Sequence, residues 1–486
     1  MIDTTVREAV LERAARRAAE RGVVIPTFAQ MIDPARQVPE VVARRLRRIG
    51  LWDLDPLNLF RITWHNEPDA RGGGFGPVNW LEVPSSLSGV NARIVALVGK
   101  WFPTGAHKVG AAFGCLVPRL VTGGFDPTTQ KAVWPSTGNY CRGGAFDSHL
   151  LACESIAILP EGMSQERFDW LASIAGEVIK TPGSESNVKE IFDKCHELRA
   201  SGEDMVIFNQ FDEPGNYLWH YAVTGPALLE AAEAAAPGVA IAGLVLATGS
   251  AGTIASGDHV KQHHPSARIA AAEALQCPTM LLNGYGAHRI EGIGDKHIPW
   301  IHNVRNTDDV IAIDDGDTMA GLRLFNERTG RQRLVAAGVP REFVAELPLF
   351  GISGIANLQA SIKFARQHDL GRDTVVLTVL TDSVDLYRSR LVELREEEGP
   401  LTRKAADAAY ERALTGQNTS NMAVLDDAAR RRIHNLKYYT WVEQQGKSVE
   451  ELDAQWDDPG YWTRIQREVA DIDRLIVEFN ARAASS

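Results

Sequence analysis

Between about residue 78 and residue 395, short apolar segments alternate with helix-forming segments. The apolar segments are rich in Val, Ile, Leu and Ala, a pattern typical of strands that are buried on both faces. We predict the following strands: Ala92–Val98, Ala132–Trp134, Ser155–Leu159, Glu177–Lys180, Met205–Phe208, Ala240–Ala247, Ala267–Ala274 and Thr374–Leu380. Helices are predicted between most of them, among them Gln165–Ala175, Ser186–Ala200 and Gly225–Ala235. This alternation predicts an α/β fold with a mostly parallel sheet.

The two ends of the chain lack this alternation. Residues 1–77 are predicted to form a helical arm followed by a loop, because small apolar residues recur at helical spacing between Val6 and Ala18. Residues 396–486 are charged and helix-forming, and we expect no strand among them. Aromatic residues in this charged segment favour docking onto the body or onto a neighbouring subunit over disorder. They are Trp441, Trp456, Tyr461 and Trp462.

The composition excludes several classes of protein. The 486 residues carry a formal net charge of −11, which argues against a general nucleic-acid binder, since such proteins neutralise phosphates. No apolar run approaches the roughly 20 residues that a membrane-spanning helix needs, and Met1–Gly22 lacks the apolar core of a secretory signal. The five cysteines form no CxxC pair, so neither a structural zinc site nor a disulfide framework is expected. We therefore expect a cytoplasmic protein without a bound metal.

One lysine lies on the turn after the first predicted strand. Lys108 stands in the sequence Pro-Thr-Gly-Ala-His-Lys-Val-Gly at residues 103–110, and a segment of small residues follows. A lysine on a loop is usually a solvated surface charge. Three later turns, each at the end of a predicted strand, change this interpretation.

The three turns offer complementary binding groups. In Pro135–Asn139, hydroxyl and amide side chains at a helix start suit a carboxylate. In Ala247–Ile254, successive N–H groups in a loop of small residues suit a phosphate, although neither a P-loop nor a dinucleotide GxGxxG pattern is present. Leu380–Val384 places Ser383 at the edge of the sheet where α/β proteins bind ligands. Each turn alone is equally compatible with an ordinary helix cap. Together with Lys108 they predict a site for pyridoxal phosphate, bound as a Schiff base.

Further motifs resemble those of a known enzyme family. Asn209–Asn216, followed by His220, resembles the QFxNPxNxxxHxxTTGPE signature of the cysteine synthase and cystathionine β-synthase branch. His288–Gly294 resembles the start of its HKIQGIGxGFIP loop, and Leu380–Val384 resembles the LPDSV of cystathionine β-synthases. The chain therefore resembles the fold-type II pyridoxal-phosphate enzymes, the tryptophan synthase β superfamily, and within it this branch.

The resemblance covers about residues 78–395 and implies a particular architecture. Each of two lobes would contain a mostly parallel twisted sheet flanked by helices. The smaller, mobile lobe would span about residues 111–222, and the larger lobe about residues 78–110 and 223–395. Residues 1–77 and 396–486 would be helical extensions of this catalytic domain.

The resemblance also implies roles within the site. Lys108 matches the Schiff-base lysine, and His107 beside it is either a packed histidine or a contact to the cofactor phosphate. Asn139 would contact the ring oxygen of the cofactor, and Ser383 its pyridine nitrogen. The phosphate loop would comprise Gly249, Ser250, Ala251, Gly252 and Thr253. The substrate would contact Ser136, Thr137, Asn139, Gln210 and Gly292.

Two residues depart from the pattern of this branch. Where the family has Thr-Gly after the asparagine, this chain has Tyr140 and Cys141, followed by Arg142. These side chains would alter the carboxylate site and the pocket for the substrate side chain. Cys141 is either a site thiol or a buried structural thiol. The turn at residues 104–108 is closer to tryptophan synthase β than to cysteine synthase. These departures leave the identity of the substrate open, whereas the prediction of pyridoxal phosphate as cofactor does not depend on them.

The expected reaction follows from the partner of the pyridine nitrogen. A serine hydroxyl at this position leaves the pyridine ring neutral, and a neutral ring is a weaker electron sink. A weaker electron sink favours loss of a β-substituent at the moment when Lys108 removes the α-proton. We expect β-replacement or β-elimination on a serine- or cysteine-type amino acid through an α-aminoacrylate, with a thiol or another nucleophile as second substrate in the case of replacement. The alternatives are a dehydratase or ammonia-lyase, a tryptophan-synthase-like condensation, and a non-catalytic partner subunit that binds the cofactor. A homodimer is expected.

Overall fold

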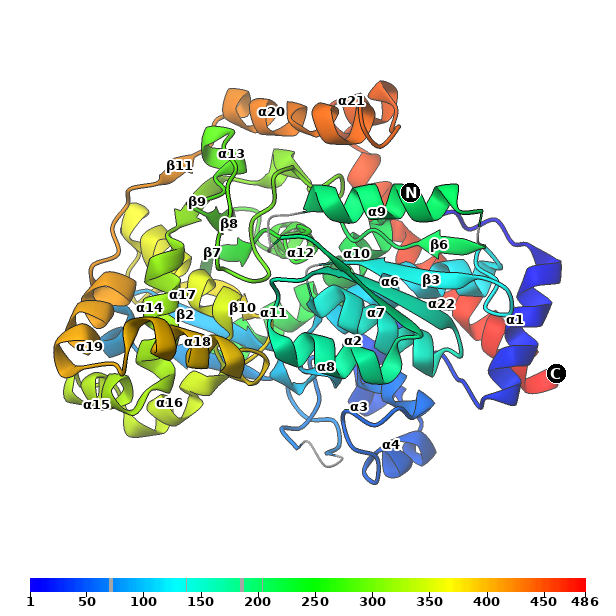
Figure 1. Cartoon of the computed structure of the whole chain (residues 1–486), viewed down its shortest axis with the longest axis horizontal. Helices are drawn as coiled ribbons and strands as arrows, with labels where there is room; N and C mark the ends of the chain where they lie inside the picture. Colours follow the sequence, from blue (N-terminus) through cyan, green and yellow to red (C-terminus); the bar gives the residue numbers. More distant parts are fainter. Residues whose placement is uncertain (70–72, 137, 184–187, 203) are drawn as a thin grey trace.

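Two β-sheets organise the computed structural model, which describes residues 1–69, 73–136, 138–183, 188–202 and 204–486 (Figure 1). The larger sheet has the strand order β1-β2-β10-β7-β8-β9-β11. Its strands are β1 (Trp80–Val83), β2 (Arg93–Val98), β7 (Ala240–Ala247), β8 (Arg268–Ala274), β9 (Asp309–Ile313), β10 (Thr374–Leu380) and β11 (Met422–Val424). The inner strands pair in parallel, whereas β1 and β11 are antiparallel edge strands.

The smaller sheet is parallel and has the order β5-β4-β3-β6. Its strands are β3 (Lys131–Pro135), β4 (Glu154–Pro160), β5 (Glu177–Thr181) and β6 (Met205–Ile207). β3 and β4 are buried after their first residue, while the edge strand β5 is largely exposed or half-buried. All these strands lie within residues 111–222, the range expected for the smaller lobe.

Helices cover both sheets and form the two ends of the chain (Figure 1). The N-terminal arm contains α1 (Glu8–Glu20), α2 (Phe28–Ile32), α3 (Pro34–Gln37) and α4 (Glu40–Leu46). With the smaller sheet are α6 (Lys108–Thr122), α7 (Asn139–Leu150), α8 (Gln165–Ile174), α9 (Val188–Ala200) and α10 (Pro214–Trp219). With the larger sheet are α5 (Ser85–Ser88), α11 (Gly225–Ala235), α12 (Ala255–His263), α13 (Thr279–Leu282), α14 (Asp315–Asn326), α15 (Arg328–Ala336), α16 (Arg341–Glu346) and α17 (Ile352–Gln367). The C-terminal part contains α18 (Arg388–Glu398), α19 (Arg403–Tyr410), α20 (Asp427–Asn435), α21 (Val449–Asp457) and α22 (Tyr461–Ser485).

The predicted α/β fold with mostly parallel sheets is confirmed. Each predicted strand forms, with bounds that differ by at most about one residue from the prediction. The prediction of a strand-free segment after residue 395 is wrong, because β11 pairs with the edge of β9. The pattern missed β11 because it is three residues long and lies in polar sequence. Ser186, the predicted first residue of a helix, lies outside the described residues.

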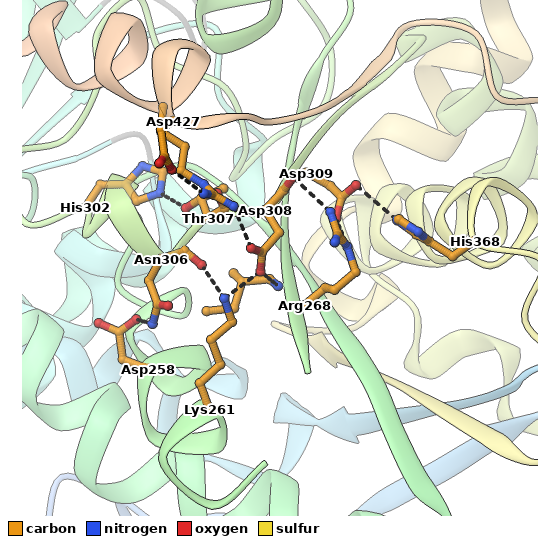
Figure 2. Close-up of polar contacts among 12 residues, drawn as sticks. Asp258, Lys261, Arg268, His302, Asn306, Thr307, Asp308, Asp309, His368 and Asp427 are labelled. Carbon is orange, nitrogen blue, oxygen red and sulfur yellow. Dashed lines mark hydrogen bonds and ion pairs between the residues drawn. The ribbon is translucent and has the colours of Figure 1, made fainter. Parts of the chain in front are cut away.

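Two aspartates at the start of β9 connect the sheet to its surroundings, as Figure 2 shows. Asp308 accepts a 2.6 Å hydrogen bond from Lys261 of α12 and a 2.8 Å hydrogen bond from Arg430 of α20. Asp309, which is fully buried, accepts a 2.9 Å hydrogen bond from Arg268 of β8. A buried carboxylate needs such partners because desolvation penalises its charge. The network therefore fixes α20, part of the C-terminal segment, onto the larger sheet.

The N-terminal and C-terminal segments pack together on one side of the molecule, where α22 lies against α1 (Figure 1). The Asn480 side chain accepts from the Ile25 backbone N–H at 3.0 Å and donates to its carbonyl at 2.8 Å. Asp473 accepts a 2.6 Å hydrogen bond from the Phe28 backbone N–H. Phe479 belongs to the same buried apolar cluster as residues of α6. Among the helices of the described residues, none combines the length and the apolar character that a membrane crossing requires.

Candidate active site

The turns predicted to form the site meet at the carboxyl ends of strands from both sheets. β2 leads towards Lys108, β3 ends before Ser136, and β7 ends before Gly249. Ligand-binding loops collect at this edge of parallel sheets. A cavity here is lined by predicted residues: Lys108, Ser136, Asn139, Tyr140, Gln210, Gly249, Ser250 and Gly292.

Lys108 is the first residue of α6, and its amine is held between two of the predicted binding segments. Thr104, four residues earlier, adopts a φ of 67°, which is strained for a β-branched residue. The Lys108 Nζ donates a hydrogen bond to Ser250 Oγ at 2.8 Å and to Gln210 Oε1 at 3.3 Å. The amine therefore lies between the loop expected to bind a phosphate and the residue expected to bind a carboxylate.

His107 is fully buried beside Lys108 and packs into the lobe interior. Its Nε2 lies 3.2 Å from Thr381 Oγ1, and its ring meets that of His220 edge-on, with centroids 5.0 Å apart. Burial, aided by the charge of Lys108, lowers the pKa of His107 to about 3. The imidazole is therefore neutral, and these contacts are those of a packed histidine.

The 249–253 loop contains a residue in the left-handed conformation, which is one component of anion-binding turns. This residue is Ala251, with a φ of 60°. Ser250 Oγ accepts hydrogen bonds from Lys108 Nζ and from Asn216 Nδ2 at 3.0 Å, which leaves its own hydrogen available to donate to an anion. Asn216 Oδ1 is buried and, among the described residues, has no hydrogen-bond partner. A Cβ at Gly252 would lie 2.2 Å from this oxygen, so the loop requires glycine there.

Gly249 and Gly292 lie close together in the wall of the cavity. A Cβ at Gly249 would lie 3.0 Å from the Gly292 carbonyl oxygen, and Gly292 itself adopts a φ of +93°. Thr253, at the end of the loop, donates from Oγ1 to the Ala247 carbonyl at 3.4 Å. Because neither glycine has a side chain, this part of the wall places no side chain in the space beside Lys108.

The segment expected to bind the substrate carboxylate lies opposite Gln210. Ser136 Oγ accepts hydrogen bonds from the Gly138 N–H at 3.1 Å and from Gln210 Nε2 at 3.4 Å. Gly138 has a φ of +156°, and a Cβ there would lie 2.2 Å from a guanidinium nitrogen of Arg167. Thr137 lies outside the described residues. Hydroxyl, amide and guanidinium donors thus converge on this part of the cavity.

Asn139 and the turn after β10 are linked by a buried hydrogen bond. Asn139 Nδ2 donates to Asp382 Oδ2 at 2.6 Å, and Asn139 Oδ1 is buried without a hydrogen-bond partner among the described residues. Tyr387 also donates to Asp382, at 2.6 Å. Ser383 Oγ accepts a 3.4 Å hydrogen bond from the Asp385 N–H, while Thr381 lines the cavity. Ser383 is therefore buried at the predicted strand end and caps the following turn in this structure.

Tyr140 and Cys141, the two departures from the branch pattern, are both buried. Tyr140 lines the cavity, and its ring packs edge-on against Trp134 with centroids 5.4 Å apart. Cys141 Sγ donates to the Gly138 carbonyl at 3.0 Å, and burial raises the pKa of its thiol to about 12. Cys141 is therefore a neutral thiol turned towards the backbone, which is the environment of a structural cysteine.

The cavity has further lining residues that the sequence motifs did not identify: Arg167, Phe211, Asp295 and Thr381. Arg167 lies within the helical pattern of α8, where nothing local distinguishes it from a surface arginine. Phe211 lies inside a matched motif, next to Gln210, so its place in the motif could have indicated that it lies at the site. Asp295 occupies the variable position of the HKIQGIGxGFIP pattern, which assigns no role to it.

The residues present fit pyridoxal phosphate. The 249–253 loop offers backbone N–H groups and the hydroxyl hydrogen of Ser250 to a phosphate. The Lys108 amine faces the same space. Gly249 and Gly292 form the cavity wall there without bringing a side chain into the space that a flat ring would occupy. These are the elements that an aldehyde cofactor with a phosphate arm requires.

Comparisons with known proteins agree with this geometry. A family model described as pyridoxal-phosphate dependent enzyme matches residues 89–382. A cysteine synthase of Staphylococcus aureus is 30% identical over 260 residues, which cover 53% of this chain and 75% of that protein. A cystathionine β-synthase of Apis mellifera is 25% identical over 321 residues, covering 64% and 58% of the two chains. The O-acetylserine dependent cystathionine β-synthase from Helicobacter pylori has the same fold, with a TM-score of 0.53 and 23% identity over 63% of this chain and 95% of that one.

The chain therefore belongs to the pyridoxal-phosphate dependent enzymes. Its relatives fall in the cysteine synthase and cystathionine β-synthase branch, as predicted. The prediction of an enzyme of β-replacement or β-elimination with pyridoxal phosphate as cofactor is confirmed at this level.

Replacing Gly252 by alanine is expected to weaken cofactor binding by about 1–3 kcal/mol, the usual effect of overpacking, or roughly 5- to 150-fold in Kd. The new Cβ would meet Asn216 Oδ1 at 2.2 Å and His220 Cδ2 at 2.8 Å. Titration of the apoprotein with pyridoxal phosphate, followed by visible absorbance, measures the effect. Gly76→Ala is the control, because its Cβ meets Glu67 at an ordinary 3.4 Å. Equal affinity in the two variants would contradict the assignment of the loop.

Proposed function

We propose that this protein catalyses β-replacement on a serine-type amino acid, with a thiol entering in place of the β-substituent and the cofactor bound to Lys108. The supporting observation is the position of the Lys108 amine, 2.8 Å from Ser250 Oγ and 3.3 Å from Gln210 Oε1. From this position the Lys108 amine can bind the cofactor covalently. After the substrate has displaced it, the same amine can take the proton from the substrate Cα.

The other proposed site residues bind and orient. Ser136, Asn139 and Gln210 hold the substrate carboxylate, and the 249–253 loop holds the cofactor phosphate. When bound, pyridoxal phosphate accepts the electron pair released at Cα. The Ser383 hydroxyl is assigned to the pyridine nitrogen, where it leaves the ring neutral and so favours early loss of the β-substituent.

Contacts between the lobes join α8 to the larger lobe beside the cavity, and a closure of this kind favours replacement. Arg167 of α8 forms an ion pair with Glu291 at 2.8 Å, and both side chains are almost completely buried. Arg390 of α18 donates to the other Glu291 oxygen at 2.7 Å. Ser389 donates to Glu166 of α8 at 2.7 Å. A site closed in this way keeps the reacting Cβ away from water until the thiol arrives.

The test uses the purified holoenzyme with O-acetyl-L-serine, L-serine or L-cysteine, each with and without sulfide or a larger thiol. We expect consumption of the amino acid that depends on the thiol, and mass spectrometry should find a product with a new bond from Cβ to sulfur. Release of keto acid and ammonia without a thiol would instead identify elimination, as in a dehydratase or ammonia-lyase. No turnover of any amino acid by cofactor-loaded protein would identify a non-catalytic subunit.

The proposal extends to the organisation of the chain. Residues 78–395 form the catalytic domain with lobes at about 111–222 and at 78–110 with 223–395, and residues 1–77 and 396–486 are extensions. We include a cytoplasmic homodimer in the proposal. Light scattering measures the mass of the particle directly.

A further inference from the structure

One carboxylic acid lines the active-site cavity without a role in the mechanism above. Asp295 is 8% exposed, and it lines the same cavity as Lys108, Gln210 and Gly292. Among the described residues, none donates a hydrogen bond to its carboxyl group. A buried carboxyl group without a partner lowers stability, so its presence in a reactive cleft points to a function.

The backbone around Asp295 is fixed on both sides. Its carbonyl accepts a 2.7 Å hydrogen bond from Thr279 Oγ1. The preceding residue, Gly294, donates its N–H to the Thr248 carbonyl at 2.8 Å, and its own carbonyl lies 3.1 Å from His288 Nε2. A group that transfers protons needs such support, because small displacements reduce its efficiency.

The electrostatic environment suits proton transfer near neutral pH. Burial raises the pKa of Asp295 to about 7, while the positive charge of Lys108 acts in the opposite direction. Both the acid and the carboxylate are therefore populated near pH 7. A group in this range can donate a proton in one half of a reaction and accept one in the other.

We propose that Asp295 donates a proton to the leaving group and later accepts the proton of the entering thiol, while Lys108 removes and returns the proton at Cα. This inference rests on the proposed function. In the first half, the Lys108 amine takes the Cα proton, and the bond from Cβ to the leaving group breaks. The leaving group departs with the electron pair and takes the proton of the Asp295 carboxyl group. In the second half, a sulfur lone pair forms the bond to Cβ, the thiol proton passes to the Asp295 carboxylate, and Lys108 returns its proton to Cα. Both residues end the cycle as they began.

The test compares two leaving groups in Asp295→Asn, which keeps the shape of the side chain and removes the acid. Sulfide release from L-cysteine benefits from protonation, and we expect its rate to fall by about 10²–10⁴-fold, the usual contribution of a general acid. Chloride leaves β-chloro-L-alanine without a proton, so its release should stay within about tenfold of wild type. Two further measurements should match wild type: the visible absorbance of the bound cofactor and the exchange of the Cα hydrogen in D2O.

Asp147→Asn is the matched control. Asp147 is also a fully buried carboxyl group whose pKa is raised by burial, but it lies in α7 and is not among the residues that line the cavity. We expect it to release sulfide and chloride like wild type. The proposal would be overturned by any of three results in Asp295→Asn: an equal fall in the rates of sulfide and chloride release, a loss of Cα hydrogen exchange, or unchanged sulfide release. A wild-type holoenzyme that releases neither leaving group would refute the proposed function itself, and the role of Asp295 with it.

Discussion

Replacing Lys108 by alanine is expected to abolish both the visible absorbance of the bound cofactor and the turnover of amino acids. The variant loses the only amine that the described site places 2.8 Å from Ser250 Oγ. It also loses the base for the Cα proton, and such a base alone contributes about 10²–10⁴-fold to a rate. An absorbance spectrum and an assay with O-acetyl-L-serine measure the two effects separately.

Lys296→Ala is the control for this prediction. Lys296 is exposed next to the cavity residue Asp295, and its ammonium lies 5.6 Å from the centre of the Tyr285 ring. An exposed contact of this kind contributes little to the free energy of folding, so the variant should keep both the absorbance spectrum and the activity of wild type. A Lys108→Ala protein that kept the wild-type spectrum would show that the cofactor is bound elsewhere.

Replacing Trp441 by alanine is expected to lower the free energy of unfolding by about 3–5 kcal/mol, the range for truncating a large buried aromatic residue. Trp441 is fully buried and donates from Nε1 to the Ile298 carbonyl at 2.8 Å. Its ring packs against His297, with centroids 5.5 Å apart, and His297 packs against Phe211 of the cavity wall at 4.7 Å. The C-terminal segment thus contacts the cavity wall through His297 and Phe211. Because Trp441→Ala removes this contact, the affinity for the cofactor should fall as well. Thermal unfolding and cofactor titration measure the two effects.

Tyr439→Ala is the matched control for Trp441, because Tyr439 lies two residues away in the same helical turn and is 59% exposed. Its replacement should change the unfolding free energy by no more than about 0.5 kcal/mol. Comparable melting of the two variants would show that the C-terminal segment is only loosely attached to the catalytic domain.

The sequence was informative where local pattern and burial agree. Strands such as Ala240–Ala247 are continuous apolar runs because they lie inside a sheet covered on both sides, so their bounds were predictable. β9 escaped prediction because it begins with Asp309, whose charge suggests a loop until its buried partners Arg268 and His368 are known. β11 escaped because a short edge strand is defined by its neighbour more than by its own residues.

The candidate site divides in a similar way. Lys108 and the 249–253 loop lie on turns whose composition already indicates their chemistry. Arg167 and Asp295 come from a helix and from the variable part of a loop, and only the tertiary fold brings them to the cavity. For Cys141, the sequence left a site thiol and a structural thiol open, and its hydrogen bond to the Gly138 carbonyl favours the structural thiol.

The central claim is that Lys108 carries the cofactor, and borohydride reduction of the holoenzyme followed by peptide mapping tests it most directly. The reagent converts the C=N bond between a lysine and pyridoxal phosphate into a stable C–N bond, which mass spectrometry locates. We predict one modified peptide, with the added mass on Lys108. Modification of a different lysine, or none in protein that has been saturated with pyridoxal phosphate, would contradict the claim.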